Sequence, residues 1–247
     1  MNNYQKKLHH IQQIVSLPEI DLQITEIDHI IESLNKKRVL KQAPAKLGFY
    51  PDQLEELLAK RPVYKEELIT LTNLLDNFRS FLSRHFGLWS LANQTTIEAI
   101  KETYHCKTGL ELMAGNAYWS KGFNEAGVKM QATDSFSWAK SSATGRQTFF
   151  PTKMYEASQA IREFTDVDLI ICCWAPNFGD GDKKILETWR QYGNPKTTLL
   201  FIGEKNGATN TPAFWKEAIE IHSPQLRKIN RSFSSFDFIE EKIFEIK

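Results

Sequence analysis

Residues 109–134, GLELMAGNAYWSKGFNEAGVKMQATD, predict the core of the fold. They indicate a short strand, a tight turn at Gly115, a helix, a second strand, and an acid, Asp134, at the tip of that second strand. In a parallel α/β unit, such a turn places backbone N–H groups and a helix N-terminus around one crevice. An acid about 20 residues after the turn reaches the same crevice and can hold a ribose through its hydroxyls.

The glycine content of the turn separates two kinds of nucleoside ligand. A nicotinamide dinucleotide requires G-x-G-x-x-G, because its pyrophosphate approaches bare backbone. This chain has Met113, Gly115 and Ala117 where small residues would be needed, so it does not match that pattern. S-adenosylmethionine (SAM) has no pyrophosphate and tolerates partial loss of glycine better. The turn therefore favours SAM, and a nicotinamide oxidoreductase is the weaker alternative.

The segment ELMAGNAYW, residues 111–119, resembles motif I of class I SAM-dependent methyltransferases, written E-x-G-x-G-x-G and followed by an aromatic residue. Glu111 and Gly115 match the motif, whereas Met113 and Ala117 replace two glycines. The resemblance extends from about residue 88 to the C-terminus. It implies an α/β fold with a Rossmann-like, mostly parallel seven-stranded sheet that has helices on both faces and is preceded by an all-α N-terminal extension.

Two domains are expected, a helical extension or cap at residues 1–85 and a methyltransferase-like domain at residues 86–247. Apolar residues at helical spacing before residue 105, for example Leu68, Leu71 and Leu75, predict helices. After residue 108, strands and helices alternate. The expected strands are residues 109–113, 129–133, 147–154, 168–174, 197–202, 225–233 and 240–246, and the expected helices are residues 119–126, 155–164, 183–192 and 212–221. The Ser-rich stretch 136–145 is expected to be either a lid or a surface connection.

The amino-acid composition limits which class of protein the chain can belong to. With 41% apolar and 25% charged residues and a formal net charge of +1, the chain has an ordinary soluble composition and no bulk-charge signal for nucleic acid or anionic membrane. Three cysteines, two of them adjacent, favour a reducing, cytoplasmic setting. No apolar run approaches 18 residues, so no membrane span is expected. The spacing lacks any C-x₂-C pair, so no metal site is expected.

The resemblance implies that residues around the turn bind SAM. Asp134, with Ser135 beside it, is expected at the ribose; the alternative is an ordinary strand-end acid in a turn. Gly115 and Asn116 offer close approach to the backbone beside the methionine part of the cofactor, and Met113 belongs to the same turn.

Four further residues complete the expected cofactor site. Glu111 resembles the acid that class I enzymes use near the methionyl ammonium, although it could simply accept nearby backbone N–H groups. Tyr155 and Glu156 match the place where family members contact adenine, and Glu156 could equally be a favourable acid at a helix start. Trp174 lies at the end of the most apolar strand, where an aromatic ring beside a sulfonium and core packing are both reasonable.

The catalytic group is harder to predict, because the methyl group of SAM is already activated and the protein mainly positions the acceptor. Glu204, at a strand tip, is a candidate general base or substrate contact. Asn177 ends the segment Trp174-Ala-Pro-Asn177 at the motif IV position, but the segment departs from the family's acid-or-Asn, Pro-Pro, aromatic pattern.

The leading hypothesis is therefore a SAM-dependent methyltransferase that transfers the methyl group by in-line displacement to an acceptor that the sequence does not specify. A catalytically degenerate SAM-binding module that serves as a binding or scaffold protein is the alternative. The non-glycine residues Met113 and Ala117 and the altered motif IV motivate it. The sequence predicts no oligomeric state.

Overall fold

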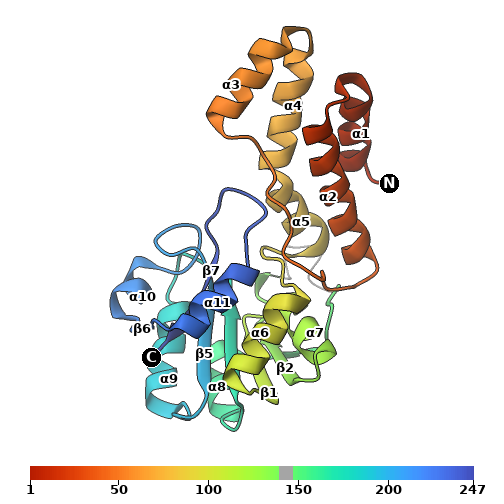
Figure 1. The fold of residues 1–247 in the computed structure, drawn as a ribbon. Coiled ribbons are helices and arrows are strands. Elements are labelled where there is room, and N and C mark those ends of the chain that lie inside the picture. The colour runs from red at the N-terminus through yellow and green to blue at the C-terminus, as the bar shows by residue number, and fades with distance from the viewer. Residues whose placement is uncertain (139–146) are drawn as a thin grey trace.

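A seven-stranded sheet forms the centre of the C-terminal part of the chain (Figure 1). The computed structural model describes residues 1–138 and 147–247. The strand order is β3-β2-β1-β4-β5-β7-β6, and β7 runs antiparallel to both of its neighbours, β5 and β6, whereas the other neighbouring strands are parallel. The strands are β1 Thr108–Leu112, β2 Lys129–Asp134, β3 Thr152–Met154, β4 Leu169–Cys173, β5 Thr198–Gly203, β6 Glu220–Ile221 and β7 Lys242–Ile246. The predicted fold class is confirmed.

Strand β4 lies between β1 and β5 and is buried on both faces, as its apolar sequence predicts. Leu169 and Ile171 belong to one hydrophobic cluster, whereas Ile170 and Cys172 belong to the cluster on the opposite face. The parallel register pairs Glu111 with Ile171, so the carboxyl ends of β1 and β4 lie side by side. Parallel pairing of β1 with β2 brings a third carboxyl end to the same edge.

Helices cover both faces of the sheet (Figure 1). One face is covered by α6 Gln94–Tyr104, α7 Tyr118–Glu125 and α11 Pro224–Ser232. The other is covered by α8 Ala157–Glu163, α9 Gly181–Tyr192 and α10 Pro212–Glu217. Asn93 caps helix α6, because its side chain accepts a hydrogen bond from the Thr96 N–H at 2.9 Å.

The N-terminal helices stand above the sheet in Figure 1, and α5 lies nearest to it. They are α1 Asn3–Val15, α2 Pro18–Asn35, α3 Pro51–Lys60, α4 Lys65–Asp76 and α5 Phe78–Phe86, with a short 3₁₀ turn at Pro62–Tyr64. Their apolar stripes are buried, as predicted, at positions such as Leu68, Leu71 and Leu75. These side chains belong to the same hydrophobic cluster as Ile171 of β4. The division into domains at residue 85 stays a prediction.

The sequence prediction of a strand at residues 225–233 is wrong, because this segment forms helix α11. Ser223 caps the helix by accepting a hydrogen bond from the Leu226 N–H at 3.0 Å, and Pro224 occupies its first position. Buried Leu226 and Ile229 have helical spacing. The Ser-Pro pair was the missed signal.

Other boundaries also differ. The strand expected at residues 147–154 is shorter in the structure, where only β3 is a strand. The helix expected at residues 212–221 ends at Glu217, and residues 220–221 instead form the short strand β6, which pairs with β7. Of the Ser-rich stretch 136–145, residues 139–145 lie outside the described residues. No helix in the described ranges is both long and apolar enough to cross a bilayer.

We predict that Ile171→Ala lowers the free energy of unfolding by about 2–5 kcal/mol, because Ile171 is fully buried in the central strand and its truncation leaves a cavity. Ile171→Val, the matched control, should cost only about 0.5–1.5 kcal/mol. Urea unfolding followed by circular dichroism measures both. Equal small losses for the two variants would contradict this description of the core.

Candidate functional site

A cavity of about 640 Å³ opens at the carboxyl ends of β1, β2 and β4. Its walls include eight of the nine residues predicted to bind the cofactor: Glu111, Met113, Gly115, Asp134, Ser135, Tyr155, Glu156 and Trp174. The ninth, Asn116, is buried and does not line the cavity, and its side-chain amide donates to the Phe86 carbonyl at 2.6 Å. Open α/β sheets bind ligands at this edge, and the volume is within the usual range for small-molecule sites.

Asp134 links the two loops that form the floor of the cavity. Its carboxylate accepts hydrogen bonds from the Gly115 N–H at 2.8 Å, the Phe136 N–H at 2.6 Å and the Trp138 indole N–H at 3.0 Å. The side chain is buried to 5% exposure and lies in the cavity wall. The acid predicted at the tip of β2 therefore lies against the turn that follows β1.

The turn after β1 has three residues in the left-handed backbone region, Met113 at φ 51°, Gly115 at 53° and Ala117 at 57°. Glycine adopts this conformation freely, whereas a side chain costs about 1–2 kcal/mol per residue. The two positions at which the chain departs from the glycine motif are therefore positions where glycine would relieve strain. The turn keeps its path without those glycines, because the surrounding structure fixes it.

Glu111 is buried beneath the same turn, at 2% exposure. One carboxylate oxygen accepts from the Ser120 N–H of α7 at 2.7 Å. Burial raises the pKa of Glu111 to about 7, and the charge of Asp134 acts in the same direction, whereas the bond from Ser120 opposes both. A ligand ammonium beside this carboxylate would stabilise the ionised form.

Tyr155 and Glu156 lie where β3 passes into α8. The Tyr155 N–H donates to the Asp134 carbonyl at 3.1 Å, which holds this segment next to the tip of β2. The Tyr155 ring packs edge-on against Phe164, with 5.5 Å between centroids. Glu156 is the N-cap residue of α8, but its exposed side chain makes no capping hydrogen bond. The carboxylate is thus available to a ligand.

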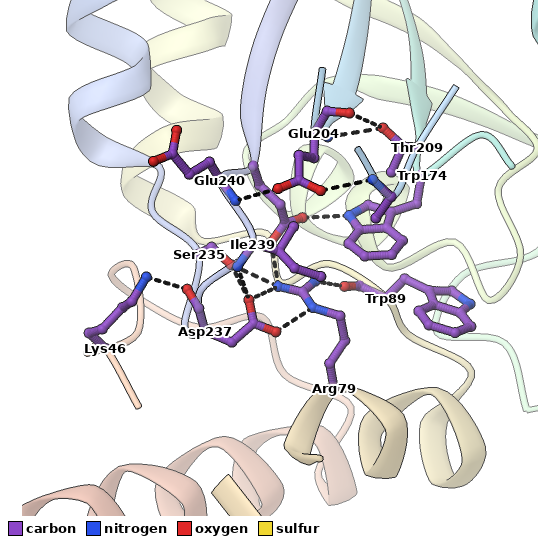
Figure 2. A network of polar contacts seen from close by, with 12 residues as sticks. Lys46, Arg79, Trp89, Trp174, Glu204, Thr209, Ser235, Asp237, Ile239 and Glu240 are labelled. Atoms are coloured by element: carbon purple, nitrogen blue, oxygen red, sulfur yellow. Dashed lines mark hydrogen bonds and ion pairs between the residues drawn. The ribbon is translucent and has the colours of Figure 1, made fainter. Parts of the chain in front are cut away.

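Trp174 closes the cavity on the side of β4. Its backbone is left-handed at φ 55°, its indole N–H donates to Glu241 at 2.6 Å, and its ring stacks on Trp89 with centroids 5.4 Å apart (Figure 2). The Arg79 guanidinium lies over the Trp174 ring, 4.6 Å from its centroid. Both tryptophans line the cavity, so a fixed aromatic pair faces any ligand there.

Arg79, which sequence reasoning missed, ties the N-terminal helices to this wall (Figure 2). It binds Asp237 through two hydrogen bonds of 2.7 Å, contacts Glu241 at 3.0 Å, and also donates to the Trp89 carbonyl. Burial alone would raise the pKa of Asp237, but hydrogen bonds and charge from Arg79 hold it below its usual value. No local sequence signal could have found this network, because its partners lie 158 and 162 positions away.

Trp119 is a second residue missed from the sequence. Its side chain is buried at 2% exposure in the cavity wall, and its indole N–H has no hydrogen-bond partner among the described residues. A buried donor without a partner costs free energy, which a ligand acceptor would recover. The aromatic at this motif position was visible in the sequence.

The predicted catalytic residues do not line the cavity. Glu204 accepts from the Ala208 N–H at 2.8 Å and the Glu240 N–H at 3.2 Å, so it joins the loops after β5 and before β7 (Figure 2). The exposed Asn177 side chain donates to the Gly207 carbonyl at 3.3 Å. Their chemical roles stay predictions, and these contacts favour structural roles. The described residues contain no group of three or more His, Cys, Asp or Glu suited to a metal ion.

No family model matches the sequence, and no curated protein matches it. Solved structures with a detectable likeness include human N-acetylserotonin methyltransferase in complex with SAM, at TM-score 0.40 and 13% identity, over 98% of this chain and 70% of that chain. A candidate O-methyltransferase from Nostoc punctiforme PCC 73102 has TM-score 0.41 and 10% identity, over 71% and 61%. A candidate type II methyltransferase from Anaeromyxobacter dehalogenans has TM-score 0.37 and 17% identity, over 46% and 48%.

The matched part of the chain thus spans less than two thirds of the two bacterial proteins. These similar structures are all named as methyltransferases, and no subfamily is distinguished. Because these scores are low, the chemistry of the cavity is derived from the residues of this chain.

We predict that Glu111 makes stability depend on pH. An unfolded carboxyl releases its proton near pH 4.5 and the buried one near pH 7, so the folded state binds more protons between these values. The free energy of unfolding should therefore fall as pH rises through this window, by about 3 kcal/mol relative to Glu111→Gln. Urea unfolding across the window measures it. A difference between the two proteins that stays constant with pH would contradict the assignment.

We also predict that Arg79→Met lowers the free energy of unfolding by about 3–5 kcal/mol, because it leaves Asp237 and Glu241 buried without a counter-charge. Lys121→Met, which removes a partly exposed partner of Glu125, should cost less than about 1 kcal/mol. Thermal and urea unfolding compare the variants. Similar losses for both would mean that the Arg79 network does not hold the helices to the cavity wall.

Proposed function

We propose that the chain is a SAM-dependent methyltransferase whose cofactor occupies the cavity at the carboxyl ends of β1 and β2. The observation that carries the proposal is the meeting of Asp134 with the Gly115 turn in the wall of one cavity of about 640 Å³. An acid at this position suits the hydroxyls of a ribose, and the turn offers backbone to the rest of a nucleoside.

The donor set around the cavity fits the three polar parts of SAM. Asp134 would hold the ribose, and the free carboxylate of Glu156 would accept from the adenine amino group with Tyr155 beside it. Glu111, which lies in the cavity wall, would face the methionyl ammonium. The ring of Trp174 would lie near the sulfonium, for which an aromatic face is a favourable neighbour.

When bound, SAM would supply an activated methyl group for transfer to the acceptor by in-line displacement. The work of the protein is to align the acceptor and exclude water. The stacked pair Trp89 and Trp174 gives the acceptor end of the cavity a rigid aromatic wall, which Arg79 holds. In this proposal residues 86–247 form the methyltransferase domain, residues 1–85 complete its wall, and the enzyme is cytoplasmic.

A second candidate function is a SAM-binding module without turnover. It is favoured by the strained, non-glycine residues Met113 and Ala117 in the turn and by Glu204 and Asn177 lying outside the cavity wall. Binding of SAM with no labelled methyl transferred to any component of a cell extract supports this alternative. A labelled product that requires the intact protein supports the enzyme.

We predict that Asp134→Ala weakens binding of S-adenosylhomocysteine, the demethylated product, by about 1–3 kcal/mol, the usual range for a lost hydrogen bond to a charged group. Isothermal titration calorimetry measures the affinity. Asp134→Asn keeps the shape of the side chain and therefore serves as a second variant in case Asp134→Ala does not fold. Asp180→Asn changes an exposed acid outside the cavity wall and should leave the affinity unchanged.

Two results would contradict the proposal at different levels. Absence of heat and of thermal stabilisation with folded wild-type protein at saturating SAM and S-adenosylhomocysteine would remove cofactor binding altogether. Normal affinity in folded Asp134→Ala would retain the cofactor but place its sugar elsewhere.

A further inference from the structure

Trp138 lies in the cavity at the place that the proposed cofactor needs. Its indole N–H donates to Asp134 at 3.0 Å, and it forms part of the cavity wall. A Cβ built on Gly115 would have the Trp138 ring carbon Cζ2 as its nearest neighbour, at 3.9 Å. One side chain therefore covers two groups proposed to contact the cofactor, the carboxylate of Asp134 and the backbone of Gly115.

The hydrogen bonds of Asp134 leave too little room for a sugar. A carboxylate has about four acceptor positions, and three are used, by the N–H groups of Gly115, Phe136 and Trp138. A ribose that offers two hydroxyls needs two positions, so one existing bond must break. The Gly115 and Phe136 donors are backbone groups of the two loops, whereas the Trp138 donor is the end of a side chain and can leave by rotation.

The backbone before Trp138 contains a strained residue. Phe136 has a left-handed conformation, φ 54°, immediately after the tip of β2. This conformation is costly for a residue with a side chain. The turn that places Trp138 over Asp134 is therefore strained. The hydrogen bond from the Trp138 indole to the buried Asp134 carboxylate is one of the interactions that offset this strain.

We propose that Trp138 is an internal competitor of the cofactor sugar and so sets the affinity of the cavity for nucleosides. The inference rests on the proposed function, because it requires the sugar to bind Asp134. With Trp138 in place the site is closed, and the ligand binds the fraction of molecules in which the indole has left Asp134. The apparent dissociation constant is the intrinsic one divided by that fraction.

The test compares the dissociation constant of S-adenosylhomocysteine for wild type, Trp138→Ala and Trp138→Phe by isothermal titration calorimetry. Trp138→Ala removes the ring and the donor, and Trp138→Phe removes the N–H but keeps an aromatic ring. We expect about tenfold tighter binding by Trp138→Ala, the effect of one hydrogen bond to a charged acceptor, and a smaller gain in the same direction for Trp138→Phe. Circular dichroism verifies that both variants are folded.

Phe178→Ala is the matched control, because Phe178 lines the same cavity, is 77% exposed and has no side-chain N–H to donate to Asp134. It should change the dissociation constant far less than Trp138→Ala does. Equal gains for Phe178→Ala and Trp138→Ala would show that any loss of aromatic bulk opens the cavity, which would overturn the specific role of Trp138. Unchanged or weaker binding by both Trp138 variants would overturn it as well, and weaker binding would assign Trp138 to stacking on the ligand.

The indole N–H signal of Trp138 in a ¹⁵N NMR spectrum, assigned through its absence in Trp138→Phe, gives a second reading. Saturating S-adenosylhomocysteine should move this signal and speed its exchange with solvent, because the N–H loses its carboxylate partner. A signal that stays protected in the saturated complex would overturn the proposal. If wild type binds S-adenosylhomocysteine but the Trp138 substitutions do not change the dissociation constant, only the role of Trp138 as a competitor is refuted. If none of the three proteins binds the ligand, the proposed function is refuted as well.

Discussion

The hydrogen bond from the Gly115 N–H to the Asp134 carboxylate, 2.8 Å long, is the contact on which the rest of the site depends. It joins the turn after β1 to the tip of β2, two neighbouring parallel strands whose register places their carboxyl ends together. The backbone of that turn carries its left-handed residues because the loops on either side are fixed. The same bond places the carboxylate in the wall of the cavity, and the proposed roles of Glu111 and Glu156 follow from it.

The N-terminal helices contribute to this site, although they are not part of the unit formed by the sheet and its covering helices. Their buried residues join the hydrophobic cluster on one face of the sheet. Arg79 of α5 then connects them to Trp174 through a buried set of ion pairs and a ring contact. Because breaking a buried ion pair is expensive, the aromatic wall and the helices are expected to move together. The N-terminal helices thus support one side of the cavity.

Much of the sheet was predictable because its signals are local. The apolar run of β4, the glycine turn and the acid at the tip of β2 each follow from periodicity or spacing. Helix α11 was missed because Ser223-Pro224 was not weighed as a helix start. The Arg79 network could not be predicted, since it joins residues about 160 positions apart through side-chain geometry. Glu204 was a reasonable candidate from its strand-end position, and only the structure shows its carboxylate bonded to two backbone N–H groups.

The central claim is that a nucleoside lies across the ends of β1 and β2 and is held at its sugar by Asp134. A crystal structure of the wild-type protein with S-adenosylhomocysteine examines it most directly. The account predicts both ribose hydroxyls within hydrogen-bonding distance of the Asp134 carboxylate, with the Trp138 indole displaced from it. Ligand density elsewhere in the molecule, or a sugar directed away from Asp134 while the indole keeps its bond, would contradict the account.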